Sequence, residues 1–205
     1  MPLETLDDTA KQILTAASRR FLHYGFKKTT MSEIADDCNM STGNLYRYFP
    51  SKLDIAETFV RVLRRETIDA LQAIAGDTAL TPAEKIRRCF RHKFRVAYDR
   101  FHNNPKAYEL SNELIVERPK LAIEWEHAEC LVIAEMLAEG ETRGDFFVGD
   151  TARMAKIFQD TVFRFTGPAV IHEGEYSDVE EELDAVLELA LDGLKCRAAR
   201  HGHKT

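Results

Sequence analysis

Apolar side chains recur every three or four residues along almost the whole chain, and this spacing restricts its fold more than any other feature. No stretch alternates apolar and polar residues for long, and no Asn-Gly type of turn joins two β-branched runs. Glycine, proline and capping residues separate the helical segments instead. The sequence therefore predicts an all-α protein of about nine helices.

The expected helices are short near residue 40 and longer elsewhere. Gly25 ends the first helix, because glycine readily adopts the left-handed conformation found at helix C-termini. Thr30 and Glu33 form a capping box before a short helix, and Thr81 and Glu84 do the same before a long one. The expected helices cover residues 7–24, 30–37, 41–48, 51–74, 81–101, 106–116, 119–140, 150–165 and 177–194.

The distribution of charge is more informative than its sum. The formal net charge is -6 at pH 7, which for the chain as a whole argues weakly against nucleic-acid binding. The basic residues Lys27, Lys28, Arg47 and Lys52 nevertheless gather near the N-terminus, whereas the acidic run 180–182 lies far downstream. A small basic head on an acidic body is compatible with DNA binding.

Cysteine usage and hydropathy favour a cytoplasmic protein. The four cysteines are dispersed, and a chain of 205 residues with 44% hydrophobic residues can bury a core without disulfides. The first residues are acidic and lack the apolar core of a signal peptide, and no apolar run is long enough to cross a bilayer. We therefore expect a cytoplasmic location and no membrane partner.

Two short helices joined by a tight turn, after a longer bracing helix, predict a helix-turn-helix within residues 30–48. In this motif the second helix enters the major groove of DNA and the first crosses the backbone. Ala35 is small enough for a close helix crossing, and Asn39 tolerates the positive φ of the turn. The small core of the motif is expected to contain Ile34, Met40 and Leu45.

Residues 30–54 form a dense motif with a further match upstream. Its residues are Ile34, Ala35, Ser41, Gly43, Leu45, Tyr46, Tyr48, Phe49, Ser51 and Lys52, with Phe21, Gly25, Thr29 and Thr30 upstream. This motif resembles the signature of the TetR family of transcriptional regulators over about the first quarter of the chain. Asn39 departs from that pattern, because the family usually has glycine there. The resemblance implies a DNA-binding domain at residues 1–52, and a ligand-binding and dimerisation domain at 53–205 that begins with a connecting helix at 53–75.

The second short helix carries side chains that suit a DNA groove. Hydroxyl and amide groups can hydrogen-bond to bases or phosphates, and an arginine can bind guanine or phosphate. By position in the family pattern, phosphate contacts are implied for Thr30, Thr42, Tyr46 and Lys52. Base-edge contacts are implied for Gly43, Asn44 and Arg47, and a contact with the DNA backbone for Tyr48.

The resemblance implies that the C-terminal part binds a small-molecule effector, largely hydrophobic, and pairs with a second copy. Two heads about one helical turn apart on a palindromic operator also require a two-fold axis. Some of the effector-site and dimer-interface residues named below are expected to belong to the chain's own core as well. Effector contacts are expected from Phe90, Phe94, Tyr98, Tyr108, Trp125 and Phe158. Contacts in the homodimer are expected from Phe158, Val162, Phe165, Leu183, Val186, Leu187 and Leu191.

Two alternatives remain open at this point. Cys89 with His92, and His127 with Cys130, each place a cysteine and a histidine three residues apart, as in a zinc site of a metal-sensing regulator. The favoured interpretation is buried cysteines beside unrelated histidines, because the loops lack the other features of a metal-binding knuckle. The other alternative is an all-α enzyme or ligand carrier with a vestigial head. The sequence contains no nucleophile with a general base at helical spacing and no glycine-rich phosphate loop that would support this alternative. We therefore expect no catalysis, metal or cofactor.

Overall fold

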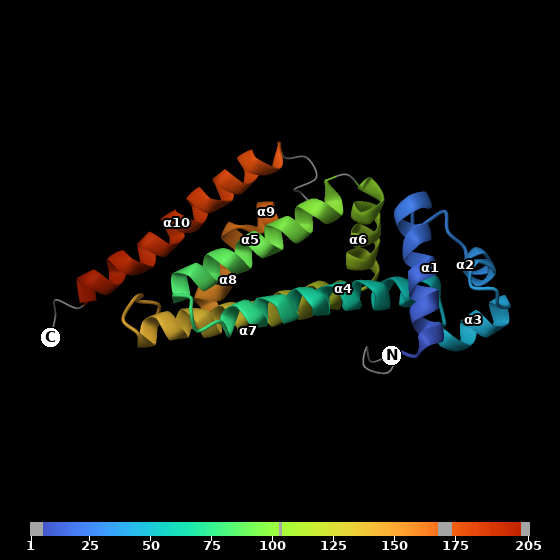
Figure 1. Ribbon diagram of the computed structural model, residues 1–205, viewed down its shortest axis with the longest axis horizontal. Coiled ribbons are helices and arrows are strands. Elements are labelled where there is room, and N and C mark those ends of the chain that lie inside the picture. The colour runs from blue at the N-terminus through green and yellow to red at the C-terminus, as the bar shows by residue number, and fades with distance from the viewer. Residues whose placement is uncertain (1–5, 103, 168–173, 202–205) are drawn as a thin grey trace. The chain divides into compact units, whose positions relative to one another are not determined.

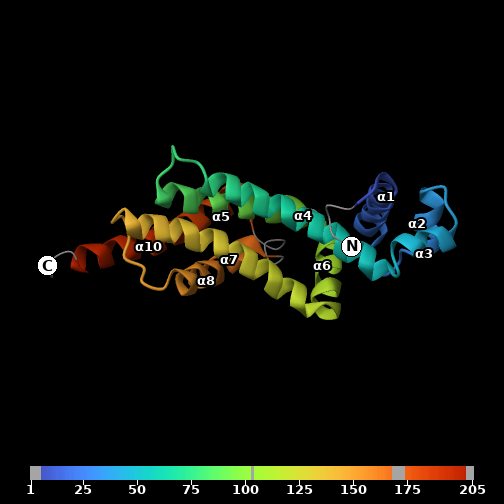
Figure 2. The ribbon, with the colours of Figure 1, turned by 90° about the horizontal axis from the view of Figure 1, so that it is seen from below.

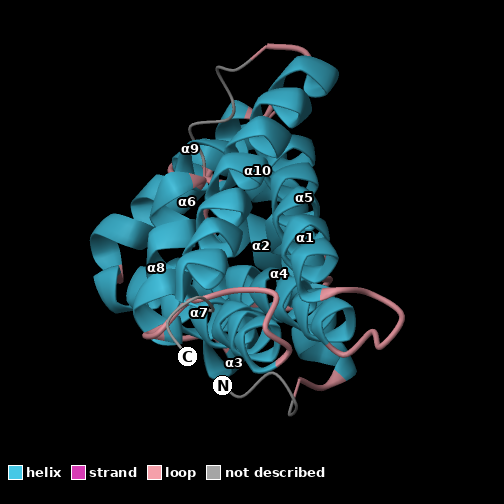
Figure 3. Cartoon of the chain, turned by 90° about the vertical axis from the view of Figure 1, so that its left-hand side faces the viewer, coloured by secondary structure: helices cyan, strands magenta, loops and turns pink. Residues whose placement is uncertain are grey.

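The computed structural model describes residues 6–102, 104–167 and 174–201, with side chains as far as residue 195. The described residues form helices and loops without strands, which confirms the all-α prediction (Figure 1, Figure 3). They divide into two compact units, Met1–Glu66 with Asn104–Ile123 and Thr67–Asn103 with Glu124–Thr205. The helices are α1 (Asp8–Tyr24), α2 (Met31–Asp37), α3 (Thr42–Tyr48), α4 (Lys52–Ala75), α5 (Pro82–Phe101), α6 (Pro105–Glu117), α7 (Pro119–Thr142), α8 (Thr151–Thr161), α9 (Phe163–Thr166) and α10 (Tyr176–His201).

The first unit is built around α1, which packs against both α2 and α6, while α2 packs against α3 (Figure 1). The side chain of Asp7 caps α1 by accepting a hydrogen bond from the Ala10 amide at 2.7 Å. Ile13, Ala17 and Phe21 are fully buried on one face of this helix, as their spacing predicts. Because α6 packs on α1, the compact unit extends beyond the DNA-binding segment predicted at residues 1–52.

The second unit contains α5 and α10 side by side (Figure 1, Figure 2). Its core includes Phe90 and Phe94 of α5 and Leu187 of α10, all fully buried. On the surface, Arg91 of α5 pairs with Asp184 of α10 at 2.6 Å. No helix in the described part of the chain is long and apolar enough to cross a membrane.

One helix was predicted over residues 150–165, but the structure ends α8 at Thr161 and begins the short α9 at Phe163. The described residues therefore contain ten helices, one more than predicted. Val162 lies between them with φ -104° and ψ 7°. The hydroxyl of Thr161 donates to the carbonyl of Ile157, and that of Thr166 to the carbonyl of Val162. Such bonds, together with two consecutive β-branched residues, weaken and bend a helix.

Candidate nucleic-acid interface

Helix α2 begins at a complete capping box. The amide of Glu33 donates to the Thr30 hydroxyl at 3.3 Å, and the Thr30 amide donates to the Glu33 carboxylate at 2.8 Å. The Thr30 hydroxyl also donates to this carboxylate. These bonds from the amide and the hydroxyl lower the pKa of Glu33. Thr30 itself stays exposed, so a phosphate contact from this residue is sterically open.

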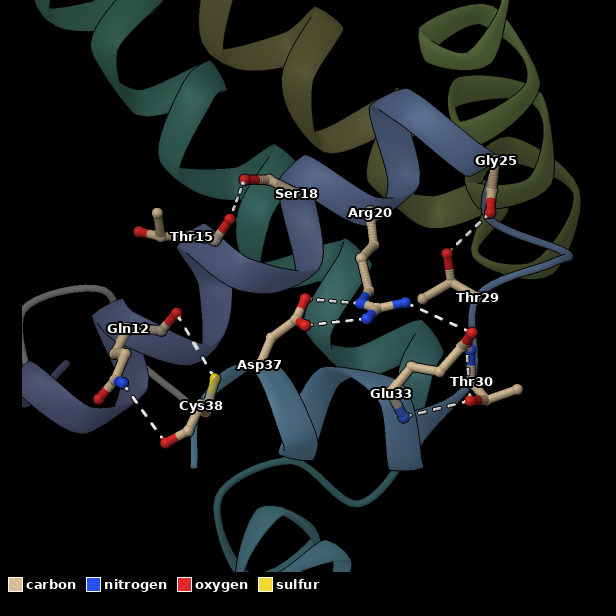
Figure 4. Close-up of polar contacts among 10 residues, drawn as sticks. All are labelled: Gln12, Thr15, Ser18, Arg20, Gly25, Thr29, Thr30, Glu33, Asp37 and Cys38. Carbon is tan, nitrogen blue, oxygen red and sulfur yellow. Dashed lines mark hydrogen bonds and ion pairs between the residues drawn. The ribbon is translucent and has the colours of Figure 1, made fainter. Parts of the chain in front are cut away.

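An arginine on α1 holds α2 in place (Figure 4). Arg20 donates to both carboxylate oxygens of Asp37 at 2.6 and 2.8 Å and lies 3.4 Å from the carboxylate of Glu33. This two-pronged hydrogen bond holds the pKa of Asp37 below its ordinary value. This clamp cannot be predicted from the sequence, because residues 17 positions apart carry no local signal of their pairing.

The turn between α2 and α3 has the geometry that the motif requires. Asn39 has φ 54°, the only positive φ of a residue other than glycine in the part of the chain that the structure describes. The Met40 amide closes the turn by donating to the Ala35 carbonyl at 3.0 Å. The Gln12 side chain of α1 reaches the Cys38 carbonyl at 3.5 Å (Figure 4). Ala35 is fully buried, consistent with the close crossing that its small size predicts.

Helix α3 turns one side toward the core of the first unit and leaves the other accessible. Ser41 caps it by accepting from the Asn44 amide at 3.1 Å. Leu45 is fully buried, as is Ile34 of α2, whereas Met40 is only half-buried. On the accessible side, the exposed residues are Gly43, Tyr46 and Arg47, and the half-buried ones are Thr42, Asn44 and Tyr48.

The packing of the chain does not require a glycine at position 43. A Cβ atom at this position would meet only the Ser41 hydroxyl, at 4.0 Å, and its φ lies outside the left-handed region. Glycine in a helix is less favourable than alanine by about 1 kcal/mol, so the fold alone gives no reason for it. An absent side chain on an exposed helix leaves room for close approach by another molecule.

Lys52 is placed differently from the rest of the predicted DNA-binding set. Its ammonium donates to the carbonyls of Phe26 at 2.6 Å and Thr29 at 2.7 Å, and lies 4.4 Å from the centre of the Phe26 ring. Burial lowers the pKa of Lys52. The side chain therefore ties the start of α4 to the loop that leads into α2, and its protons are already directed at protein carbonyls.

The predicted effector contacts separate into two groups. Tyr108 is exposed in the first unit, whereas the other five lie in the second. There, Phe90 stacks on Phe158 with ring centroids 6.1 Å apart, and Phe94 packs edge-on against Tyr98 at 5.7 Å. The five residues of the second unit are Phe90, Phe94, Tyr98, Trp125 and Phe158.

Most residues predicted for the dimer interface lie inside the chain's own core. A side chain without accessible surface has none to offer to a second subunit, so the apolar stripe of α10 is covered within the second unit. Val186 alone of the predicted set is half-buried. An accessible groove of about 550 Å³ lies beside this core, and its lining includes the exposed apolar residues Ile157 of α8 and Leu189 of α10. The buried residues are Phe158, Val162, Phe165, Leu183, Leu187 and Leu191.

The cysteine and histidine pairs do not assemble a zinc site. No three histidine, cysteine, aspartate or glutamate side chains among the described residues are placed to hold a metal ion. Cys89 is fully buried and donates to the Leu71 carbonyl at 3.8 Å, and burial raises the pKa of its thiol to about 12. A cysteine binds zinc as a thiolate, so the environment of Cys89 does not suit a zinc ligand. His92 faces Arg95 across 3.3 Å.

Two family models match the chain. The model for bacterial regulatory proteins of the tetR family matches residues 13–58, which include α2 and α3. The model for the tetracyclin repressor-like C-terminal domain matches residues 82–187, more than half of the chain.

Individual relatives agree with these models. The HTH-type transcriptional repressor KstR2 of Mycolicibacterium smegmatis is 28% identical over 137 residues, which is 66% of this chain and 66% of that protein. The chain thus spans just under two-thirds of this relative. A putative TetR-family regulator from Mesorhizobium loti superposes with a TM-score of 0.73 at 18% identity, covering 90% of this chain and 95% of that one. The TetR-family repressor FadR of Thermus thermophilus, solved with lauroyl-CoA, superposes with a TM-score of 0.64 at 24% identity, covering 90% and 94%. The chain belongs to the TetR family of bacterial transcriptional regulators.

Proposed function

We propose that this regulator is a homodimeric repressor that binds a palindromic operator and leaves it when a small, largely hydrophobic effector binds the C-terminal domain. The accessible side of α3 is the observation that carries the proposal. It combines a glycine that the fold does not require with hydroxyl, amide and guanidinium groups. These are the groups that read base edges and hold phosphates in a major groove.

The proposed contacts follow the position of each residue on the helix-turn-helix. Thr42 and Tyr46, with Thr30 of the α2 cap, bind phosphates and set the register of α3 on the duplex. Gly43, Asn44 and Arg47 face the base edges, and Tyr48 contacts the DNA backbone. For Lys52 we propose a positioning role through the loop before α2, because its ammonium is already held by carbonyl oxygens.

We propose that the two copies meet along the accessible side of α8 and α10. Ile157 is 44% exposed and Leu189 is 78% exposed, although both are large apolar residues. They line the same groove, together with Met154 and Ala190. Burial of such a patch against a second copy removes apolar surface from water and provides the two-fold axis that a palindrome requires.

The proposed effector is apolar in most of its surface. The aromatic side chains of the second unit favour such a ligand, and the lauroyl-CoA bound by the Thermus thermophilus relative carries a long acyl chain. Effector binding would favour one conformation of the C-terminal domain and change the distance between the two DNA-binding domains of the dimer. A metal ion is a less suitable effector, because Cys89 is buried as a thiol rather than exposed as a thiolate.

The decisive experiment measures binding to the DNA upstream of the gene and to random DNA of equal length. We expect salt-sensitive binding with a clear preference for the upstream sequence. Arg47→Ala should reduce this preference by about tenfold or more, because a bidentate contact with guanine contributes about 1–3 kcal/mol of discrimination. Arg88→Ala is the matched control, since it removes the same charge from an exposed position on α5.

Two results would contradict the proposal at different levels. If wild-type protein does not bind the upstream DNA even at low salt, the regulator does not act on this DNA, and the repressor mechanism must be abandoned. If Arg47→Ala discriminates as well as wild type, the reading face of α3 has been assigned wrongly. Equal losses in Arg47→Ala and Arg88→Ala would indicate a general effect of charge.

A further inference from the structure

Three polar side chains from three helices meet in the interior of the second unit. Lys93 of α5, Glu129 of α7 and Gln159 of α8 are 7%, 6% and 7% exposed. The Lys93 ammonium lies 2.5 Å from the Glu129 carboxylate and also donates to the side-chain oxygen of Gln159. The Gln159 amide nitrogen donates to the same carboxylate at 2.9 Å. These residues form a closed ring of charge-assisted hydrogen bonds, the polar triad.

The polar triad lies against aromatic side chains. The Lys93 ammonium is 5.3 Å from the centre of the Phe90 ring, and Phe90 stacks on Phe158. About two turns further along α5, Tyr98 packs edge-on against Tyr176 of α10 at 5.2 Å. Both tyrosines are half-buried, whereas both phenylalanines are buried. Aromatic side chains therefore occur both beside the triad and at half-buried positions further along α5, and a molecule with an apolar body and a polar end complements this arrangement.

Stability does not account for the polar triad. Removing a lysine and a glutamate from water costs free energy that their pairing seldom recovers, and apolar replacements are often at least as stable. The surrounding helices already share an apolar core that includes Ile133 of α7. Gln159 lies in the last turn of α8, just before the break at Val162. A group bound at the triad would therefore act directly on the end of this helix.

Charge balance determines which head group the triad can accept. The ion pair and the neutral amide carry no net charge together. A hydroxyl group placed between Lys93 and Glu129 can accept from the ammonium and donate to the carboxylate, so both charges keep a partner. A carboxylate bound to Lys93 would compete with Glu129 for the ammonium and add a negative charge to the buried triad, and an amine bound to Glu129 would compete with Lys93 and add a positive charge. Either outcome is strongly unfavourable.

We infer that the polar triad is the head-group end of the effector site, and that the effector is an uncharged alcohol or phenol. Its hydroxyl enters between Lys93 and Glu129, and its apolar body lies against Phe90 and Phe158. This inference rests on the proposed ligand-responsive function. Entry of the hydroxyl separates α5 from α7 at this point and changes the hydrogen bonds of Gln159, which transmits binding to α8.

Trp125 provides a direct readout. It is the only tryptophan in the chain and lies four residues before Glu129 on the same face of α7. The complete protein, without DNA, is titrated with 4-hexylphenol, 4-hexylbenzoate or 4-hexylbenzylamine while tryptophan emission is recorded. We expect the phenol to bind about tenfold or more tightly than either charged analogue. Equal or tighter binding of a charged analogue, or no binding of the phenol, would overturn the inference.

A pair of double variants tests the residues. Lys93→Met with Glu129→Gln removes both charges and nearly preserves volume, so no single charge is left buried. Lys85→Met with Glu139→Gln is the matched control, because it removes another α5–α7 ion pair, at 2.6 Å. We expect phenol affinity to fall about tenfold in the first variant and to stay unchanged in the second. Similar affinities in both variants would overturn the assignment of the triad.

Two further measurements keep the outcomes distinct. If the first double variant does not fold, Gln159→Ala replaces it, with an expected loss of about fivefold in phenol affinity and with unchanged affinity as the overturning result. Operator binding is measured separately on ligand-free protein. Failure of wild-type operator binding contradicts the proposed function. If operator binding is intact but phenol affinity does not change in the triad variants, only this inference is contradicted.

Discussion

Gly43→Ala is expected to stabilise the folded chain while weakening its binding to operator DNA. The new Cβ would meet only the Ser41 hydroxyl, at 4.0 Å, so no steric cost opposes the substitution. Alanine is favoured over glycine by about 1 kcal/mol in a helix interior, and by less in the first turn, where Gly43 lies. The free energy of unfolding should therefore rise by about 0.5 kcal/mol.

The same methyl group is expected to weaken operator binding about tenfold, or about 1.4 kcal/mol, because it separates α3 from the DNA surface. Urea denaturation followed by circular dichroism measures the stability, and fluorescence anisotropy with labelled operator at fixed salt measures the affinity. Thr15→Ala on the exposed face of α1 is the control. It also raises helix propensity, but it lies outside the proposed DNA-contacting set.

Two results would refute the reasoning about Gly43. A gain in stability with unchanged operator affinity would show that no close approach to DNA occurs at this residue. A loss of stability would show that the glycine serves the fold, which contradicts the open space around its Cα atom.

The remaining predictions concern the α2 clamp, the core and the dimer. Asp37→Asn should lower the free energy of unfolding above about pH 4 and have little effect well below it, because Arg20 holds the pKa of Asp37 below its ordinary value. As the pH falls, Asp37 of the unfolded chain takes up its proton first. The stability that the ionised carboxylate contributes is therefore lost as the pH passes through the pKa of the folded state. Urea midpoints across this range measure the effect, and a difference independent of pH would contradict it. Leu187→Ala should lower the free energy of unfolding by about 2–5 kcal/mol, because the side chain is fully buried. Urea denaturation measures this loss, and a loss below about 1 kcal/mol would argue against a core position. Leu189→Glu should shift the protein toward monomers in analytical ultracentrifugation and weaken operator binding, whereas an intact dimer would exclude the α8–α10 surface as the interface.

The helix-turn-helix could be predicted closely because its signals are local. The Thr30 and Glu33 capping box, the tolerance of Asn39 for positive φ, and the spacing of Leu45 act within a few residues of chain. The end of α8 was harder to predict, since hydroxyl-to-carbonyl bonds from Thr161 compete with helical propensity only in a particular conformation.

The proposed dimer surface and effector site differ in part from the residues that the sequence led us to expect. The stripe that includes Leu183 and Leu187 is apolar whether it covers the chain's own core or a second copy, and periodicity alone does not distinguish these cases. The polar triad gave no signal in the sequence, because Lys93, Glu129 and Gln159 are ordinary polar residues of amphipathic helices until three helices bring them together.

The sequence by itself determined the all-helical fold, most helix boundaries and the family to which the chain belongs. These properties depend on the apolar period and on capping residues that interact over one or two turns. Only the tertiary structure decided that Arg20 clamps Asp37, that Lys52 holds the loop before α2, and that a charged pair is buried beside the Phe90 ring. The reason is that burial and pairing are properties of space, and residues distant along the chain acquire them only when the helices pack.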